Sequence, residues 1–265
     1  MSKVVRGIAV LRLGRRGDLA QDDREYPGIS MHDQAQVVVA LSGGMDSCVC
    51  AALAVRDFGA NATAALHISY GQRTERRELA AFQTICDRLQ IPQRLSFRTP
   101  FFHAIGGSAL TDDKISMPEA GPEIGLHIPV TYVPFRNAHF LSAAVSWAEV
   151  LGAAWIYIGA VQQDSSGYPD CRPEFYQAFN EVIRRGTKAG RIRVETPLIA
   201  LRKAQIVTLG LELGAPFDLT WSCYGAEDRA CGICESCALR RKAFATAGAV
   251  DPISYASQTV TPLRD

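Results

Sequence analysis

Apolar runs of strand length alternate along this chain with longer stretches of helical periodicity. The run QVVVAL at residues 36–41 is β-branched and unbroken, which is typical of a strand that is covered on both faces. Residues 46–58 then have helical character, and Gly59 follows them as a suitable C-cap. A strand followed by a helix is the unit that the next segments repeat.

The same alternation continues over most of the chain. Further strands are predicted at residues 62–69, 93–98 and 153–161. Further helices are predicted at residues 74–90, 137–152 and 172–186. The first of these helices carries an apolar face made of Leu79, Phe82, Ile85, Cys86 and Leu89. Alternating strands and helices predict an α/β fold, a doubly wound and mainly parallel sheet with helices on both faces.

Two segments fall outside this alternation. Residues 1–33 join a short apolar alternation to a polar, turn-rich stretch, and we expect them to form an accessory extension. Residues 100–130 are rich in glycine and proline, which predicts an extended loop. Long loops of this kind either cover an active site or stay disordered.

The composition narrows the choice of partners. Hydrophobic residues make up 48% of the 265 residues, charged residues make up 21%, and the formal net charge is +1. The 28 Lys and Arg residues are scattered, which disfavours a nucleic acid, because binding to its backbone needs concentrated positive charge. No apolar run approaches the roughly 20 residues that cross a bilayer. A cytoplasmic protein that acts on a small molecule, with no membrane partner, is expected.

The stretch LSGGMDSC at residues 41–48 stands at the end of the first predicted strand. Gly43 and Gly44 lack a Cβ, so successive backbone N–H groups can approach an anion, and the hydroxyls of Ser42 and Ser47 lie beside them. The helix that follows adds its positive end. The stretch therefore predicts a phosphate cradle, with a plain turn as the alternative. The chain has no G-x-x-x-x-G-K-[ST] loop, which disfavours a nucleoside-triphosphate hydrolase.

Four of the eight cysteines crowd into SCYGAEDRACGICESC. They are Cys223, Cys231, Cys234 and Cys237. A C-x-x-C turn brings two sulfurs to one ion, and two overlapping pairs with a fourth cysteine predict a closed tetrahedral zinc site of structural role. An iron–sulfur cluster and a redox pair are the alternatives. We expect the other four, Cys48, Cys50, Cys86 and Cys171, to be small buried hydrophobes.

A polar loop follows the predicted strand at residues 153–161. The loop GAVQQDSSGYPDCRPEF sets carboxylates, hydroxyls and Arg172 around Gly167. Such a loop can hydrogen-bond the edge of a planar heterocycle while Tyr168 packs on its face. A solvated surface loop is the alternative.

Several of these motifs together resemble a known family. The run from Ser42 to Ser47 resembles the SGGxDS loop of the PP-loop ATP pyrophosphatases, also called adenine nucleotide alpha hydrolase-like proteins. The chain as a whole resembles the 7-cyano-7-deazaguanine synthase (QueC) family over residues 36–244. The other motifs that carry this resemblance are SYGQR at 69–73, VPFRN at 133–137, the SGYPDCR loop, RKAQI at 202–206 and the cysteine segment running into CALRRKAF.

The resemblance implies an ATP-dependent C–N ligase of queuosine biosynthesis. Its substrates would be 7-carboxy-7-deazaguanine, ammonia and ATP with Mg²⁺, and an adenylated carboxylate and an amide would precede the nitrile. The implied ATP-binding residues are Leu41, Ser42, Gly43, Gly44, Asp46, Ser47, Arg73 and Arg136. The implied catalytic residues are Asp46, Lys203 and Arg240. The implied residues for the base and its carboxylate are Asp164, Ser166, Gly167, Tyr168, Asp170 and Arg172.

The resemblance also implies a homodimer, and the chain as a whole is expected to comprise three segments. These are the extension at 1–33, an ATP-binding α/β domain at 34–215 and a zinc-binding segment at 216–265 packed on the core. Phe135 departs from the family, because a glycine is usual there. Crowding of the ATP pocket by its ring would fit an altered turnover. Residues 162–165 also depart from the family, and residues 1–33 have no counterpart in it.

These departures leave three alternatives open. A related ligase would join the deazaguanine carboxylate to another amine, for example on a protein, with residues 1–33 as the candidate contact for a protein partner. A tRNA-thiolating PP-loop enzyme would need a basic surface for RNA. A non-catalytic purine-binding module would keep the fold and the zinc.

Overall fold

The computed structural model describes residues 35–121, 127–161 and 167–257. All of them belong to one compact unit, which spans residues 31–265. The predicted extension at 1–33 lies outside the described residues. Among the helices that are described, none combines the length and the apolar character needed to cross a membrane.

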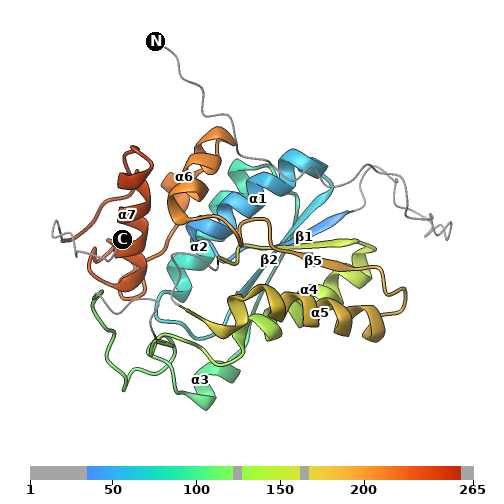
Figure 1. Cartoon of the computed structure of the whole chain (residues 1–265), viewed down its shortest axis with the longest axis horizontal. Coiled ribbons are helices and arrows are strands. Elements are labelled where there is room, and N and C mark those ends of the chain that lie inside the picture. The colour runs from blue at the N-terminus through green and yellow to red at the C-terminus, as the bar shows by residue number, and fades with distance from the viewer. Residues whose placement is uncertain (1–34, 122–126, 162–166, 258–265) are drawn as a thin grey trace, which may run out of the picture. The chain divides into compact units, whose positions relative to one another are not determined.

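The described strands form a parallel sheet (Figure 1). They are β1 (Val37–Ala40), β2 (Thr63–Ser69), β3 (Gln93–Arg98), β4 (Trp155–Ile158) and β5 (Arg193–Glu195). Their order across the sheet is β3-β2-β1-β4-β5, and Val38 of β1 stands between Ala64 of β2 and Ile156 of β4. The predicted α/β fold with a parallel sheet is confirmed.

Helices cover both faces of this sheet (Figure 1). One face carries α1 (Met45–Phe58), α2 (Glu75–Arg88), α6 (Lys203–Glu212) and α7 (Glu235–Thr246), and the other carries α4 (Arg136–Leu151) and α5 (Pro173–Gly186). Because successive side chains of a strand point to opposite faces, Val37 and Val39 join the first core while Val38 joins the second. This explains why the first strand is apolar at every position.

The predicted elements match the observed ones except after residue 186 and in the loop at 100–130. The sequence reading did not include β5, α6 or α7. The loop begins with a short helix, α3 (Phe101–Ile105), because one helical turn sinks Phe102 against Tyr70 and Phe140, at centroid distances of 5.9 and 6.3 Å. Two short 3₁₀ turns, η1 (Pro169–Cys171) and η2 (Phe217–Leu219), complete the described elements.

The strand order places a ligand site at one position of the sheet. From β1 the chain moves outward to β2 and β3, and it then returns to the other side of β1 to form β4 and β5. The loops after β1 and β4 therefore leave in opposite directions, which opens a crevice at the carboxyl ends of these two strands.

Candidate active site

A cavity of about 260 Å³ opens at this crevice. Its walls come from the loop after β1, from Gly159 just after β4, and from α2, α4 and α6, which contribute Glu78, Arg136 and Lys203. Segments that are distant in the sequence thus meet at the carboxyl edge of the sheet, as the doubly wound topology requires.

The glycine-rich loop is held by its own short hydrogen bonds. The hydroxyls of Ser42 and Ser47 lie 3.0 Å apart, and Gly44 N–H donates to Ser42 Oγ at 3.3 Å. Ser47 Oγ in turn donates to the Gly44 carbonyl oxygen at 3.0 Å. Since α1 begins at Met45, its positive end faces the cavity beside these groups. The arrangement can receive phosphate oxygens.

Gly43 cannot be replaced without moving the loop. Its φ is +93°, and a Cβ at this position would lie 2.6 Å from the carbonyl oxygen of Glu78. The Gly43 carbonyl oxygen also accepts a hydrogen bond of 2.8 Å from Trp221 N–H. The loop is therefore wedged between α2 and the segment that leads to the cysteines.

Gly159 is a second required glycine, which the sequence reading did not single out. A Cβ there would lie 2.8 Å from the Asp46 carbonyl carbon and 2.8 Å from Ser47 N. The end of β4 is thus pressed against the first turn of α1. A glycine directly after a buried strand was the available signal.

Asp46 and Lys203 form an ion pair inside the cavity. Lys203 Nζ lies 2.5 Å from Asp46 Oδ2, and the two side chains are 16% and 22% exposed. Asp46 Oδ1 is buried and has no hydrogen-bond partner among the described residues. The pair gives the cavity a cation for phosphate and an acceptor that remains open.

Arg136 lies deeper in the cavity, in an aromatic frame. Its guanidinium donates to the Tyr70 hydroxyl at 3.0 Å and lies 5.4 Å from the centroid of that ring and 5.8 Å from the Phe140 ring. Arg136 Nε is buried without a partner among the described residues. This donor is open to an anionic or carbonyl ligand.

Arg73 and Arg240 also line the cavity, but their guanidinium groups bind the protein itself. Arg73 donates to the carbonyl oxygens of Ala109, Asp112 and Ile115 at 2.7, 3.1 and 2.8 Å. Arg240 is 2% exposed and forms a two-pronged pair with Asp251 at 2.8 and 2.9 Å. In this structure they hold neighbouring segments in place.

Arg240 makes three further bonds, and these fix the segment just before the cysteines. It donates to Thr220 Oγ1 at 2.6 Å, to the Phe217 carbonyl oxygen at 3.1 Å and to Ser222 Oγ at 3.5 Å. Trp221, whose N–H holds Gly43, lies within this segment. Arg240 therefore supports the glycine-rich loop from behind.

The polar loop after β4 is described only from Gly167 onward, so Asp164 and Ser166 lie outside the described residues. Gly167 has a φ of +76°. Tyr168 lines the cavity, and its hydroxyl donates to Thr131 Oγ1 at 3.0 Å. This ring is where a flat ligand would meet the cavity wall.

Asp170 is buried behind the cavity, where it caps α4. Its Oδ2 accepts Asn137 N–H at 3.0 Å, and its Oδ1 is buried with no partner among the described residues. Cys171 was expected in the core, but it is only partly buried and lines the cavity, because Asn137 Nδ2 holds its Sγ at 3.4 Å. The other three cysteines of that group, Cys48, Cys50 and Cys86, are buried as predicted.

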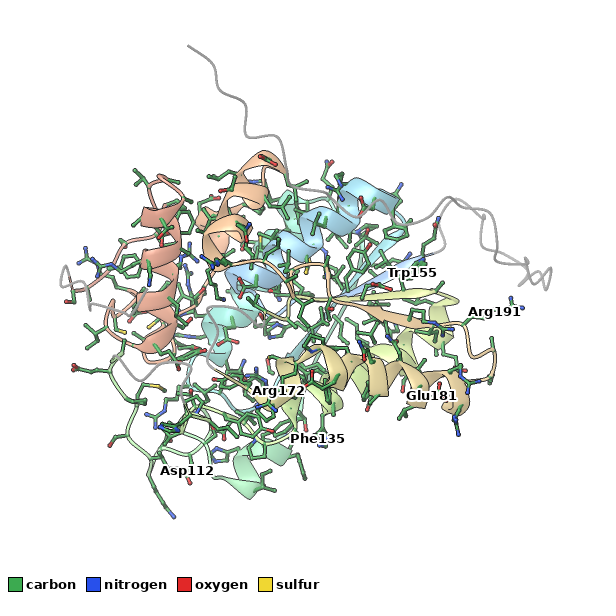
Figure 2. The ribbon with its side chains drawn as sticks, in the orientation of Figure 1. Asp112, Phe135, Trp155, Arg172, Glu181 and Arg191 are labelled. Atoms are coloured by element: carbon green, nitrogen blue, oxygen red, sulfur yellow. The ribbon has the colours of Figure 1, made fainter. Side chains whose placement is uncertain are left out.

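Phe135 and Arg172 lie near the start of α5, away from the cavity wall (Figure 2). Phe135 is 58% exposed, and its ring packs edge-on against His139 and Phe175 at 6.4 and 6.2 Å. Within the described residues, the Phe135 ring therefore does not crowd the cavity, and crowding gives no support for an altered turnover. Its φ of +57° explains why glycine suits this position. Arg172 is exposed.

Three cavity residues on and before α2 were missed by the sequence reading. Thr74 Oγ1 donates to Glu78 Oε1 at 2.6 Å, and Gln72 Nε2 donates to Glu78 Oε2 at 2.9 Å. Burial raises the pKa of Glu78 from 4.5 to about 7, although these two donors and Arg136 oppose the rise. No pattern in the sequence marks Glu78 as a cavity residue, since it stands among other charged residues of an amphipathic helix.

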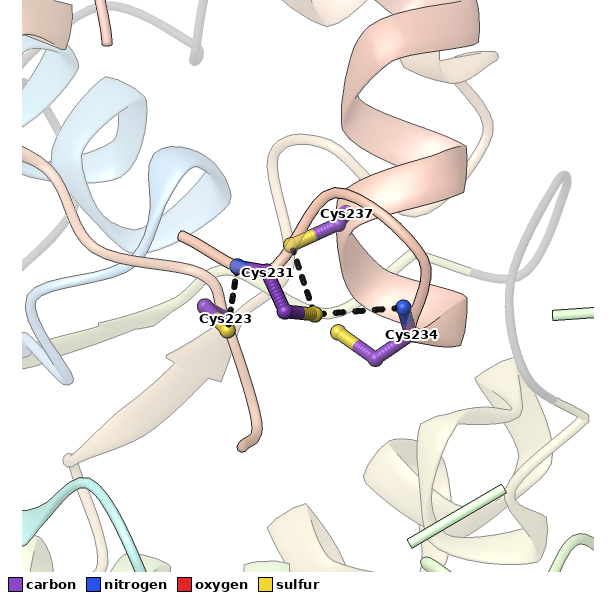
Figure 3. Close-up of side chains that lie close together, drawn as sticks. All are labelled: Cys223, Cys231, Cys234 and Cys237. Carbon is purple, nitrogen blue, oxygen red and sulfur yellow. Dashed lines mark hydrogen bonds between the residues drawn. The ribbon is translucent and has the colours of Figure 1, made fainter. Parts of the chain in front are cut away.

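The four C-terminal cysteines converge on one point (Figure 3). Their sulfur atoms all lie within 4.8 Å of one another. Cys231 N–H donates to the Cys223 sulfur and Cys234 N–H to the Cys231 sulfur, both at 3.3 Å. Hydrogen bonds from neighbouring thiols lower the pKa of Cys223 far below its usual range, and thiolate character at Cys223 raises the pKa of Cys234 to about 12.

The opposite pKa shifts of Cys223 and Cys234 mean that the clustered thiols compete for protons. Without a cation, four sulfurs at this spacing share their protons, whereas a divalent metal accepts four thiolates together. The residues therefore fit a metal ion. The Cys₄ set supplies all four tetrahedral positions, which suits a structural centre.

The glycine-rich loop can cradle phosphate at the switch point of a doubly wound parallel sheet, and a four-cysteine centre lies next to it. Together these features are typical of a PP-loop protein of the α/β class. Comparison with known proteins gives the family. The family model described as "Queuosine biosynthesis protein QueC" matches residues 36–248. The chain belongs to the QueC family.

Individual relatives agree with this assignment. The chain is 70% identical over 224 residues to the "7-cyano-7-deazaguanine synthase" of Koribacter versatilis, which covers 84% of this chain and 94% of the relative. It is 64% identical to the protein of the same name from Acidobacterium capsulatum, covering 83% and 96%. A structure of NMN synthetase from Francisella tularensis aligns at 19% identity with a TM-score of 0.40, covering 70% and 64% of the two chains. That likeness is too distant to bear on function.

Proposed function

We propose that this protein is a 7-cyano-7-deazaguanine synthase. As an ATP-dependent C–N ligase, it would convert 7-carboxy-7-deazaguanine and ammonia to the nitrile through an adenylated carboxylate and an amide. The observation that carries the proposal is membership of the QueC family, with relatives of that name at 70% and 64% identity. The PP-loop geometry of the cavity supports the adenylation step.

The chemistry explains why a phosphate cradle serves this reaction. Hydroxide is a poor leaving group from a carboxylate, whereas AMP leaves readily, so the acid must first be adenylated. Catalysis then depends chiefly on positioning ATP and neutralising its pyrophosphate. We assign the pyrophosphate to Ser42, Gly43, Gly44 and Ser47, with Lys203 as the neutralising cation, and Mg²⁺ to the open oxygen of Asp46.

The remaining site residues receive different roles in this proposal. Arg136 and Leu41 line the nucleotide side of the cavity. Arg73 and Arg240 act through the segments that they hold. Tyr168 forms the wall for the base, Gly167 sets the turn that leads into it, and Asp170 keeps a buried oxygen without a partner among the described residues. We propose Asp164 and Ser166 as further contacts of the base and its carboxylate. Arg172, which is exposed outside the described cavity, would join them by turning toward it when the substrate binds.

We propose zinc as the metal of the four-cysteine centre, with a structural role. Cys234 and Cys237 belong to the same core as Val37 and Val39 of β1, so the metal would fasten the C-terminal segment to the sheet. Elemental analysis should find one zinc per chain, and a chelator should lower the melting temperature. Iron with a visible charge-transfer band, or a melting temperature that chelation leaves unchanged, would contradict the assignment.

The proposal also includes a homodimer in the cytoplasm, and residues 1–33 remain the candidate contact for a protein partner. Size-exclusion chromatography with light scattering checks the dimer and whether it needs residues 1–33. The two samples are the full chain and a chain that starts at residue 34. A dimer is expected for both chains. A full chain that is monomeric while active would contradict the dimer.

The product of the purified protein tests the proposed function. With ATP, Mg²⁺, ammonia and 7-carboxy-7-deazaguanine, mass spectrometry should find the nitrile, together with AMP and pyrophosphate. Release of ADP, or the absence of both amide and nitrile, would contradict the proposal. An inactive Gly43→Ala variant serves as the control for contaminating activity.

A further inference from the structure

Glu78 is a carboxylate of the cavity that the adenylation chemistry does not use. It lies on the first turns of α2, with its side chain partly buried in the cavity wall. Its backbone carbonyl oxygen is the atom that a Cβ on Gly43 would strike at 2.6 Å. The main chain of Glu78 is therefore fixed beside the glycine-rich loop, while its carboxylate is attracted by Arg136, which lies 6.0 Å from the Tyr168 ring on the side where the acid would bind.

The two bonds that Glu78 accepts prepare it to act as an acceptor. Thr74 Oγ1 and Gln72 Nε2 each donate to one of its two oxygens, at 2.6 and 2.9 Å. Gln72 is itself fixed, because its Oε1 accepts Tyr70 N–H at 2.8 Å. A carboxylate oxygen has two lone-pair sites, so each oxygen of Glu78 keeps one acceptor position. The carboxylate is thus oriented without being saturated.

The charges around Glu78 come from several elements. Arg136 on α4 attracts it, while Glu75 on its own helix repels it. Tyr70, after β2, is linked to Arg136 at 3.0 Å, and Asp46 on α1 and Lys203 on α6 line the same cavity. Burial outweighs the attraction, and the pKa of Glu78 rises to about 7. A proton acceptor works best when its pKa lies near the operating pH.

We propose that Glu78 is a catalytic residue, the general base that accepts the proton of the incoming amine after adenylation. The inference rests on the proposed function, because it requires an acyl adenylate in this cavity. Like the ammonium of lysine, free ammonia is largely protonated at neutral pH, and its addition product carries a positive nitrogen. A neighbouring carboxylate removes that charge before AMP leaves.

Amide formation begins when ammonia attacks the acyl adenylate. The lone pair of ammonia forms a C–N bond at the carboxyl carbon, and the carbonyl electrons move to oxygen. One N–H proton passes to Glu78, the C=O bond reforms, and the C–O bond to AMP breaks with its electron pair on AMP. Glu78 then returns its proton to solvent, and a second ATP adenylates the amide oxygen with release of pyrophosphate. The O-adenylated amide loses one N–H proton to solvent, and Glu78 accepts the other as the C≡N bond forms and the C–O bond to AMP breaks with its electron pair on AMP.

The test separates adenylation from amine addition in Glu78→Gln, which keeps the shape of the side chain. Acid-dependent exchange of pyrophosphate into ATP should stay within about twofold of wild type, while ammonia-dependent product formation should fall about 10²-fold. In wild type, kcat should rise with pH through about 7, as Glu78 ionises. The variant should lack this rise. Hydroxylamine, which is unprotonated at neutral pH, should restore product as the hydroxamate.

Glu75→Gln is the matched control. It removes one negative charge from the same helix, and Glu75 pairs with Arg98 at the surface and does not face the described cavity. It should keep the wild-type rate above neutral pH and shift the pH profile slightly toward lower pH, because the charge that repels Glu78 is gone. Equal losses in both variants, equal loss of exchange and product formation in Glu78→Gln, or an unchanged pH profile would overturn the inference. Absence of acid-dependent exchange in wild type would instead overturn the proposed function.

Discussion

The two ends of the cavity are built in different ways. At the phosphate end, the main chain makes the site: Gly44 N–H bonds Ser42, and the Gly43 carbonyl oxygen receives Trp221 N–H. At the acceptor end, side chains from separate segments make it, since Tyr168 donates to Thr131 and Thr131 to Glu235, at 3.0 and 3.4 Å. The phosphate end is therefore rigid, and its main-chain contacts depend little on which side chains are present. The acceptor end, in contrast, can be altered one side chain at a time.

Gly43→Ala should have the largest effect, because it disturbs the main chain itself. A Cβ at φ +93° meets the Glu78 carbonyl oxygen at 2.6 Å, so several amides must shift together. Loss of even one positioned donor costs about 10²–10³-fold in rate. We expect pyrophosphate exchange to fall by about 10³-fold. Near wild-type exchange would show that the loop does not hold the nucleotide.

Lys203→Ala should come next, with exchange lower by about 10²-fold, the cost of one removed charge at the transition state. The variant also leaves Asp46 without its cationic partner at 2.5 Å, so tighter binding of Mg²⁺ at this carboxylate is expected. Steady-state kinetics over a range of Mg²⁺ concentrations measure both effects. Lys188→Ala is the control, since it removes a lysine next to the exposed end of α5. A wild-type rate for Lys203→Ala would contradict its assigned role.

Tyr168→Phe should have a smaller effect that is confined to the acceptor end. Losing its hydrogen bond to Thr131 costs about 1 kcal/mol, or about fivefold in binding. We expect KM for the deazaguanine acid to rise by about that factor while KM for ATP stays unchanged. Equal changes in the two KM values would mean that the two ends of the cavity are not independent.

Substitutions at Phe135 should have the smallest effect, because this residue lies at neither end. Phe135→Gly and Phe135→Ala both lose the ring contacts, but only glycine adopts φ +57° without strain. Urea unfolding should find the glycine variant more stable than the alanine variant by about 1 kcal/mol. Activity should remain within about twofold of wild type for both, since the described cavity excludes this residue. A selective loss of ATP binding would contradict this.

The same contrast explains what could be predicted from the sequence. Local patterns predict the strands other than β5, most of the helices and the glycine-rich loop. These patterns are an unbroken β-branched run, amphipathic periodicity and adjacent glycines. The four cysteines carry their own spacing, and the structure brings their sulfurs within 4.8 Å. Such features need no knowledge of distant contacts.

Other features depend on distant contacts. β5 is three residues long and is recognised as a strand only by its pairing with β4. Gly159 matters because α1 lies against it, and the raised pKa of Glu78 arises from burial that no helical pattern records. The orientation of Phe135 toward His139 and Phe175 is likewise set by α4 and α5.

A crystal structure with a non-hydrolysable ATP analogue tests the central claim most directly. The account predicts that the β- and γ-phosphates contact the main-chain amides from Ser42 to Ser47, with Lys203 turned toward them. A triphosphate bound elsewhere, with the Asp46–Lys203 pair and the glycine-rich loop untouched, would contradict it.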